Sequence, residues 1–237
     1  MATTVFNCGG ECGGSSSIGT NPHWWLGGTT APTIDTTVFR SGLRSYRTNT
    51  TLTSCSLQLV PSLGSPTIAV LRAYIYITTP PTVSRVIQGL VYGGGYLYGL
   101  GYNTADSKWY AAYDNQTTVT LGASGVAIST SAWHKIAYLL NVSANPHLLD
   151  ISVDGVALGQ LSRAAAADTI SRIECGNLSA LSSYDVNHDD FLLSLTGVDY
   201  PLPAGYSLSY IPNADGTHNG AGANDFEFAD GTDITNA

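Results

Sequence analysis

Charge is scarce in this sequence, and what there is has a negative excess. Charged residues make up 11% of the chain, with 9 lysines and arginines against 17 aspartates and glutamates, which gives a formal net charge of −8. This balance repels a phosphate backbone, so nucleic acid is not an expected partner. It also disfavours amphipathic helices, whose solvent face is usually charged.

Long apolar runs are missing as well. No segment approaches the ~20 apolar residues that a membrane-spanning helix needs. The opening residues, Met1-Ala2-Thr3-Thr4, contain neither the basic nor the apolar part of a secretory signal peptide. We therefore expect a soluble protein that has no membrane partner and does not use the usual signal route.

Cysteine is also rare, with four in the chain. Cys8 and Cys12 form a C-x3-C pair, but a zinc site would need two further ligands, and nothing selects His23 as one of them. Plain thiols or one local disulfide are favoured there over a metal, and no cofactor is expected. Cys55 and Cys175 lie in apolar runs and are interpreted as buried small residues, with a bridge between them as the lesser alternative.

The chain is rich in short segments in which apolar and polar residues alternate, the pattern of half-buried strands. In residues 67–77, one face carries Leu71, Ala73, Ile75 and Ile77, and the other carries Arg72, Tyr74 and Tyr76. Further strands are predicted over residues 85–92, 96–102, 108–114, 125–128, 133–142, 148–153, 169–175 and 190–195. Turn residues separate them, including Gly93-Gly94-Gly95 and the hairpin signal Asp154-Gly155. The alanines of residues 163–167 are the one place where a short helix is predicted.

Strands in this number without intervening helices predict an all-β fold, an antiparallel β-sandwich with a turn-rich C-terminal extension. We expect an N-terminal arm over residues 1–34 that contributes the first strand, a sandwich core over 35–199 and the extension over 200–237.

Three segments together resemble the laminin-G/concanavalin A-like jelly roll, over about residues 3 to 196. The Arg-Ser-Gly segment of residues 40–47 is similar to its early strand, in which the following hydrophobic residue turns back into the sandwich. Residues 133–138, followed by 150–155, are similar to its Trp-containing hairpin, which ends in Asp-Gly. Residues 188–194 look like its closing strand. Calcium is implied by this resemblance alone.

A narrower resemblance concerns lectin-like virion proteins of tailed bacteriophages, carried on the head or the tail. It rests on residues 6–11, on the Arg-Ser-Gly segment and on the tail segment of residues 206–219. It implies a non-enzymatic structural, decoration or adhesion protein that is assembled into a virion in the host cytoplasm. The implied partners are other virion proteins, further copies of the chain in a homo-oligomer, and a host-surface glycan. A carbohydrate-binding module that recognises a surface glycan is the alternative.

Catalysis finds little support in the residues. Laminarinase-type enzymes of this fold need paired carboxylates on one strand, but their Glu-x-Asp-x-x-Glu pattern is absent and the glutamates Glu11, Glu174 and Glu227 are isolated. Asp189 and Asp190 are adjacent, so on a regular strand they point to opposite faces, which favours a turn or edge role or a weak calcium contact. Jelly-roll polysaccharide lyases use Tyr, His and Arg, which occur here, so a glycan-cleaving enzyme is the least favoured alternative. His134 is expected to face solvent, with Trp133 facing the core.

Aromatic residues provide the candidate ligand site. The residues proposed as a glycan platform are Tyr96, Tyr98, Tyr102, Trp109, Tyr113 and Asp114. If their rings line the concave sheet, they can stack on sugars while the hydroxyls and Asp114 hydrogen-bond to them. In the favoured alternative, some of the rings fill the sandwich core and the others form a subunit contact.

Overall fold

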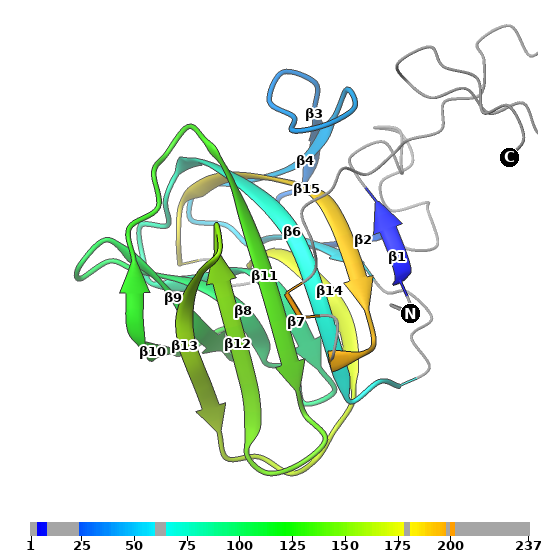
Figure 1. Cartoon of the computed structure of the whole chain (residues 1–237). Helices are drawn as coiled ribbons and strands as arrows, with labels where there is room; N and C mark the ends of the chain where they lie inside the picture. Colours follow the sequence, from blue (N-terminus) through cyan, green and yellow to red (C-terminus); the bar gives the residue numbers. More distant parts are fainter. Residues whose placement is uncertain (1–3, 9–23, 60–64, 178–180, 198–199, 202–237) are drawn as a thin grey trace, which may run out of the picture.

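The computed structural model describes residues 4–8, 24–59, 65–177, 181–197 and 200–201 (Figure 1). These residues form two antiparallel sheets stacked as a jelly-roll type sandwich, without an α-helix in the described part. The all-β prediction is therefore confirmed. The expected helix is wrong, because Arg163 ends a strand and residues 164–169 form no helix.

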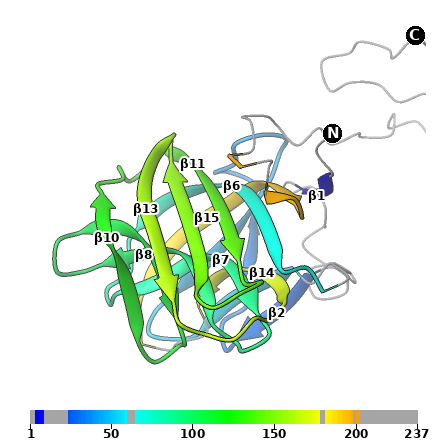
Figure 2. The same cartoon turned by 60° about the horizontal axis from the view of Figure 1, so that its bottom comes forward.

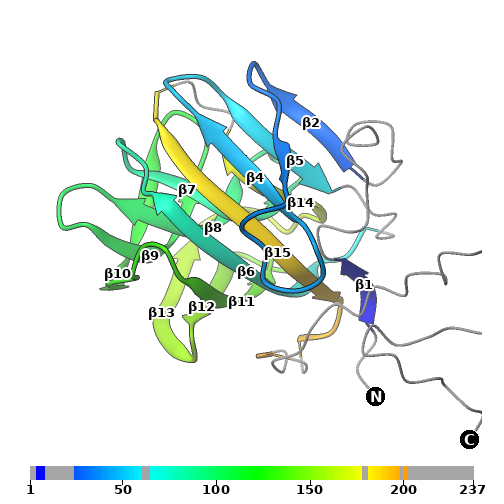
Figure 3. The same ribbon diagram turned by 90° about the horizontal axis from the view of Figure 1, so that it is seen from above.

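The first sheet has the strand order β13 (Val156–Arg163), β12 (His147–Val153), β11 (Trp133–Asn141), β6 (Ile68–Thr79), β15 (Tyr184–Ser194), β4 (Ser45–Thr50) and β3 (Thr33–Asp35). β1 (Thr4–Cys8) also pairs with β15, beyond the end of β4. Figure 3 shows β15 beside β4.

The second sheet has the order β10 (Val119–Val126), β9 (Lys108–Asp114), β8 (Leu97–Asn103), β7 (Arg85–Tyr92), β14 (Ile170–Asn177), β5 (Cys55–Leu59) and β2 (Trp24–Gly28). Figures 1 and 2 show β11 and β13 of the first sheet in front of β7 and β8 of the second. β13 also contacts β9 and β10, so these edges of the two sheets lie against each other.

The core lies between the sheets. β6 contributes Leu71, Ala73, Ile75 and Ile77, all buried as their alternation predicts. The opposite face of β6 is less exposed than expected, because Arg72 and Tyr74 are also buried. Cys55 and Cys175 are buried free thiols, as the favoured interpretation held.

Three side chains are oriented differently from the prediction. On β11 the inward side chains are Ile136, Tyr138 and Leu140, so His134 has the inward parity. Trp133 instead lies against Tyr76 of β6, with ring centroids 5.6 Å apart. Leu43 does not turn into the sandwich, since 62% of its surface is exposed, and Tyr46 is the residue that enters the core.

The second sheet is sharply bent where two glycines face each other. Gly89 of β7 is the register partner of Gly99 of β8. A Cβ on Gly89 would lie 2.0 Å from the Tyr98 carbonyl oxygen, and one on Gly99 would lie 1.9 Å from the Gln88 carbonyl oxygen. Only glycine permits so close a backbone approach. Asp114 is the register partner of Leu97, which pairs with Val91 near the end of β7, yet its carboxylate lies 3.5 Å from the Val86 amide near the start of β7.

Candidate functional site

The structure distributes the proposed platform residues over both faces of the second sheet. The rings of Tyr98, Tyr102 and Trp109 are buried in the core, and Tyr96 and Tyr113 are half-buried against it. The three buried rings therefore fill the core and do not form an exposed stacking surface. Asp114 has the opposite parity to Trp109 and Tyr113 on β9 and lies on the outer face.

Three of these tyrosines nevertheless meet in one cluster, because the two sheets bring two register pairs together. On β12 and β13, His147 is the partner of Arg163, and on β8 and β9, Tyr98 is the partner of Tyr113. We call the group that they form the Arg163 cluster, which consists of Tyr92, Tyr96, Tyr98, Tyr113, His147 and Arg163. It lies between the sheets where β7 and β13 end and β12 begins, at the lower edge of Figure 1.

The Arg163 guanidinium is the centre of this cluster. Its carbon lies 3.7 Å from the ring centroid of Tyr96 and 5.6 Å from those of Tyr92 and Tyr113. These distances place the cation within reach of three aromatic rings. Tyr96 in turn stacks on Tyr92, with centroids 5.8 Å apart and planes inclined by 28°.

A directed set of hydrogen bonds fixes the inner part of the cluster. Nη1 of Arg163 donates to the hydroxyls of Tyr92 and Tyr98, over 2.9 and 3.3 Å. Nε2 of His147 lies 2.6 Å from the carbonyl oxygen of Ala166, which only accepts, so Nε2 carries the proton. In the neutral ring, Nδ1 then accepts from the Tyr98 hydroxyl, 3.1 Å away. Both Tyr98 and His147 are completely buried.

The electrostatics of the cluster keep Tyr98 neutral and Arg163 charged. Burial raises the pKa of Tyr98, and the neighbouring guanidinium only partly opposes this. Partial burial alone would lower the pKa of Arg163, but the hydrogen bonds to the two phenol oxygens outweigh it, so the pKa is raised. The cluster thus holds one permanent cation among neutral rings.

Several polar atoms at the outer side of the cluster remain unbonded within the described part of the chain. They are the hydroxyls of Tyr96 and Tyr113 and the Nε and Nη2 atoms of Arg163, whose residues are all half-buried. Among the described residues, no carboxylate forms an ion pair with Arg163 either. Phenol hydroxyls beside a guanidinium offer the donors and acceptors that sugar hydroxyls require.

Asp114 belongs to a separate polar group on the bent sheet. Nδ2 of Asn177 donates to Oδ2 of Asp114 and to the carbonyl oxygen of Val86, both over 3.0 Å. Burial raises the pKa of Asp114 and also that of Glu174, which is paired with Arg172 at 3.1 Å. Asp114 is 1% exposed, so its carboxylate is occupied inside the protein.

Asp189 and Asp190 do not point to opposite faces. The register of β15 shifts between Asp189 and Leu192, and Asp190 has a positive φ of 50°, which breaks the alternation. Asp189 accepts from the Arg40 amide at 3.0 Å, while Asp190 binds the Arg40 guanidinium and the Ser41 hydroxyl. The two carboxylates therefore hold one segment of the β3–β4 loop.

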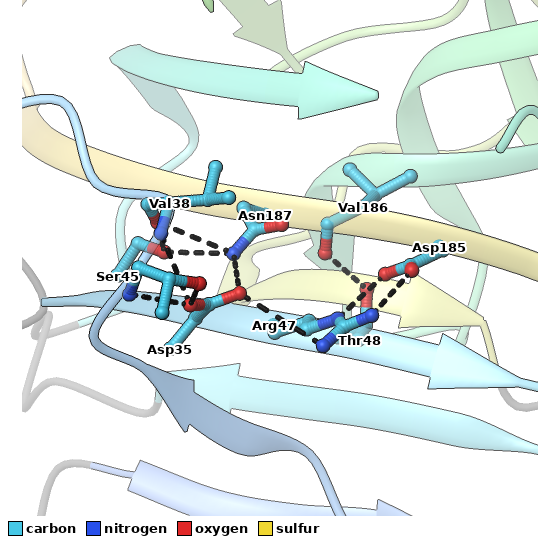
Figure 4. A network of polar contacts seen from close by, with 9 residues as sticks. Asp35, Val38, Ser45, Arg47, Thr48, Asp185, Val186 and Asn187 are labelled. Carbon is cyan, nitrogen blue, oxygen red and sulfur yellow. Dashed lines mark hydrogen bonds and ion pairs between the residues drawn. The ribbon is translucent and has the colours of Figure 1, made fainter. Parts of the chain in front are cut away.

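A neighbouring network fixes the other end of this loop (Figure 4). Arg47 binds Asp185 through two parallel hydrogen bonds of 2.8 and 2.6 Å, and Asn187 donates to Asp35 at 3.0 Å. Burial would raise the pKa of Asp35, but the hydrogen bonds from Thr37, Asn187 and Val38 lower it to about 2. These acidic groups thus have protein donors as partners, and the described residues contain no group of three or more side chains suited to a metal.

Two further sequence predictions concern the membrane and the outlying segments. The described residues contain no helix that is long and apolar enough to span a bilayer. Cys12, His23 and the segment from residue 202 onward lie outside the described residues, as does the side chain of Cys8.

Comparisons with known proteins show the fold and leave the family open. No family model and no curated protein matches the chain. Among solved structures, domain 4 of AbnA, an extracellular arabinanase from Geobacillus stearothermophilus in complex with arabinotriose, has a TM-score of 0.58 at 10% identity, over 83% of this chain and 96% of that one. The cellulose induced protein Cip1 has 0.55 at 16% identity, over 81% and 97%. Alginate lyase vAL-1 from a Chlorella virus has 0.54 at 10%, over 81% and 99%.

Proposed function

We propose that this chain is a carbohydrate-binding β-sandwich that holds a glycan at the outer side of the Arg163 cluster. The observation that carries the proposal is the packing of the half-buried Tyr96 and Tyr113 rings around Arg163. The two hydroxyls and the Nε and Nη2 atoms of Arg163 form no hydrogen bond within the described residues. The domain of AbnA that shares the fold is described in complex with arabinotriose, and this supports the choice of a sugar as ligand.

Binding without catalysis is part of the proposal. The Tyr98–His147 pair, the one place in the cluster where a histidine meets a phenol, is completely buried and its two members are engaged with each other. Glu174 is likewise buried and paired with an arginine. A general acid or base must reach its substrate within hydrogen-bonding distance. Depolymerisation of any member of a polysaccharide panel by the purified chain would refute this part.

A glycan array followed by titration calorimetry tests the binding itself. The double variant Tyr96→Phe/Tyr113→Phe keeps both rings and removes the two free hydroxyls, so we expect it to fold normally and to bind at least about tenfold more weakly. Tyr110→Phe is the matched control, because Tyr110 also lies on β9 but has the outward parity and binds Asp106. If no glycan binds the unmodified chain, the proposal fails.

Display of this domain on a bacteriophage virion, as a structural or adhesion protein in a homo-oligomer, is a further proposal that rests on the sequence resemblance. It is compatible with glycan binding, because a displayed domain can attach a particle to a surface. Mass spectrometry of purified particles tests it, and absence of the chain from them would end it.

A further inference from the structure

Taking the proposed glycan site as the premise, we propose that the bound sugar carries a carboxylate, so that the ligand class is an acidic saccharide built from uronic acids. The juxtaposition behind this inference is a half-buried arginine that is surrounded by tyrosines and has one edge without a partner among the described residues.

Three of the other arginines in the described part of the chain have carboxylate partners. Arg40 pairs with Asp190, Arg47 with Asp185 and Arg172 with Glu174. Among the described residues, the hydrogen-bond partners of the Arg163 guanidinium are two phenol oxygens. In a chain with 17 acidic and 9 basic residues, an arginine without an acidic partner leaves its charge available to a ligand.

The guanidinium is also held in a fixed orientation. The hydrogen bonds of Nη1 to Tyr92 and Tyr98 anchor one end, and the Tyr96 ring supports one face at 3.7 Å. The edge formed by Nε and Nη2 remains, and two parallel N–H groups on such an edge match the two oxygens of a carboxylate. Because the group is already oriented, little side-chain entropy is lost on binding.

The tyrosine hydroxyls complete a site for a sugar that is acidic at one position and neutral elsewhere. The Tyr96 and Tyr113 rings lie beside the guanidinium, and their hydroxyls can both donate to and accept from the hydroxyls of a sugar ring. The chain as a whole is acidic and provides no general attraction for polyanions, so a preference for an acidic sugar must come from Arg163 itself.

The test is calorimetric titration of the full chain, at one fixed ionic strength, with tetrasaccharide probes of the common uronic acids, their carboxyl-reduced counterparts and a sulfated neutral tetrasaccharide. We expect at least one uronic acid tetramer to bind at least tenfold more tightly than its carboxyl-reduced form. The sulfated sugar should bind more weakly than that tetramer, because a tetrahedral group does not match the planar pairing.

The variants assign the preference to one residue. Arg163→Gln should abolish the difference between the acidic and the reduced sugar, and Arg163→Lys, which keeps the charge but not the paired donors, should retain only part of it. Lys108→Gln is the matched control, because it also removes one positive charge. Lys108 is exposed at the start of β9, whereas Tyr113 of the cluster lies near the end of that strand. Thermal unfolding confirms that each variant folds. If Arg163→Gln does not fold, Arg163→Lys provides the test. Its affinity for the acidic sugar should fall while its affinity for the carboxyl-reduced sugar stays the same.

The outcomes separate this inference from the proposed function. Equal binding of acidic and reduced sugars, stronger binding of the sulfated sugar, or a preference that survives in Arg163→Gln would overturn the acidic ligand while glycan binding stands. If none of the probes and no array glycan binds, the glycan site itself is wrong.

Discussion

The side-chain amide of Gln88 donates to Nδ1 of His188 over 3.0 Å and thereby joins β7 of one sheet to β15 of the other. The remaining imidazole nitrogen, Nε2, lies 2.9 Å from the Thr48 hydroxyl, and Tyr138 donates to the oxygen of Gln88 over 2.8 Å. Because an amide N–H can only donate, His188 accepts at Nδ1 and is protonated at Nε2. The interior thus contains a neutral, fully hydrogen-bonded histidine.

This histidine makes stability depend on pH in a defined direction. Burial lowers the pKa of His188 from 6.5 to about 3. Between these values the unfolded chain binds a proton that the native chain does not, so the free energy of unfolding falls as the pH drops below about 6.5, by up to about 1.4 kcal/mol per pH unit. Urea denaturation at pH 7.5, 6, 5 and 4 measures the slope. His188→Gln, which keeps hydrogen-bonding capacity without titrating, should show a shallower one, and identical slopes would contradict this assignment.

Removing the Tyr98 hydroxyl should affect the Arg163 cluster as well as stability. Tyr98→Phe deletes the acceptor of one arginine hydrogen bond and leaves Nδ1 of buried His147 without a donor, at a cost of about 1–3 kcal/mol. Tyr102→Phe is the control, because the Tyr102 hydroxyl has no hydrogen-bond partner among the described residues, and it should cost less than about 0.5 kcal/mol. Chemical denaturation of both variants compares them, and equal losses would contradict the network.

The glycine pair in the bend should not tolerate a side chain. In Gly99→Ala the new Cβ would lie 1.9 Å from a backbone oxygen of β7, so the strand must shift, and we expect a loss of about 2 kcal/mol or more. Gly95→Asn is the comparison, because Gly95 has a φ of 82° in open space, where asparagine is tolerated. A melting temperature for Gly99→Ala equal to that of the unmodified chain would show that the bend is softer than the structure implies.

The buried thiols of Cys55 and Cys175 should not react with thiol reagents in the native state. Burial raises the pKa of Cys55 to about 11 and that of Cys175 well above its usual value, so neither forms a reactive thiolate near pH 8. In the double variant Cys8→Ser/Cys12→Ser, a thiol reagent should label neither Cys55 nor Cys175 in buffer. It should label both in guanidinium chloride. Rapid labelling in buffer would mean that the sandwich opens far more easily than its packing indicates.

The sequence predicted the strand ends well where turn residues flank the strand. β7 and β9 begin and end at the predicted residues for this reason. β13 was missed, since Val156–Arg163 is an edge strand with mostly exposed residues and little alternation. Its last residue was assigned instead to an alanine-rich helix.

The site could be predicted only in part, because its two halves are brought together by packing of the sheets. Parity placed Tyr96 and Tyr98 on one face of their segment and Tyr113 on one face of the next, but it could not say whether these faces coincide or whether they form the interior. His147, Arg163 and Tyr92 had no signal of their own, since their meeting depends on the pairing of β12 with β13 and on the stacking of the sheets. Asp114 was separated from the tyrosines by its opposite parity on β9.

Because the Arg163 cluster draws its residues from both sheets, the proposed ligand binding would depend on assembly of the whole domain. A partly folded chain with only one sheet in place would have either the arginine or most of the tyrosine rings, and so would recognise nothing. A ligand bound there would contact residues of both sheets. At a concentration of a hundred times its dissociation constant, it would raise the free energy of unfolding by about 2.7 kcal/mol.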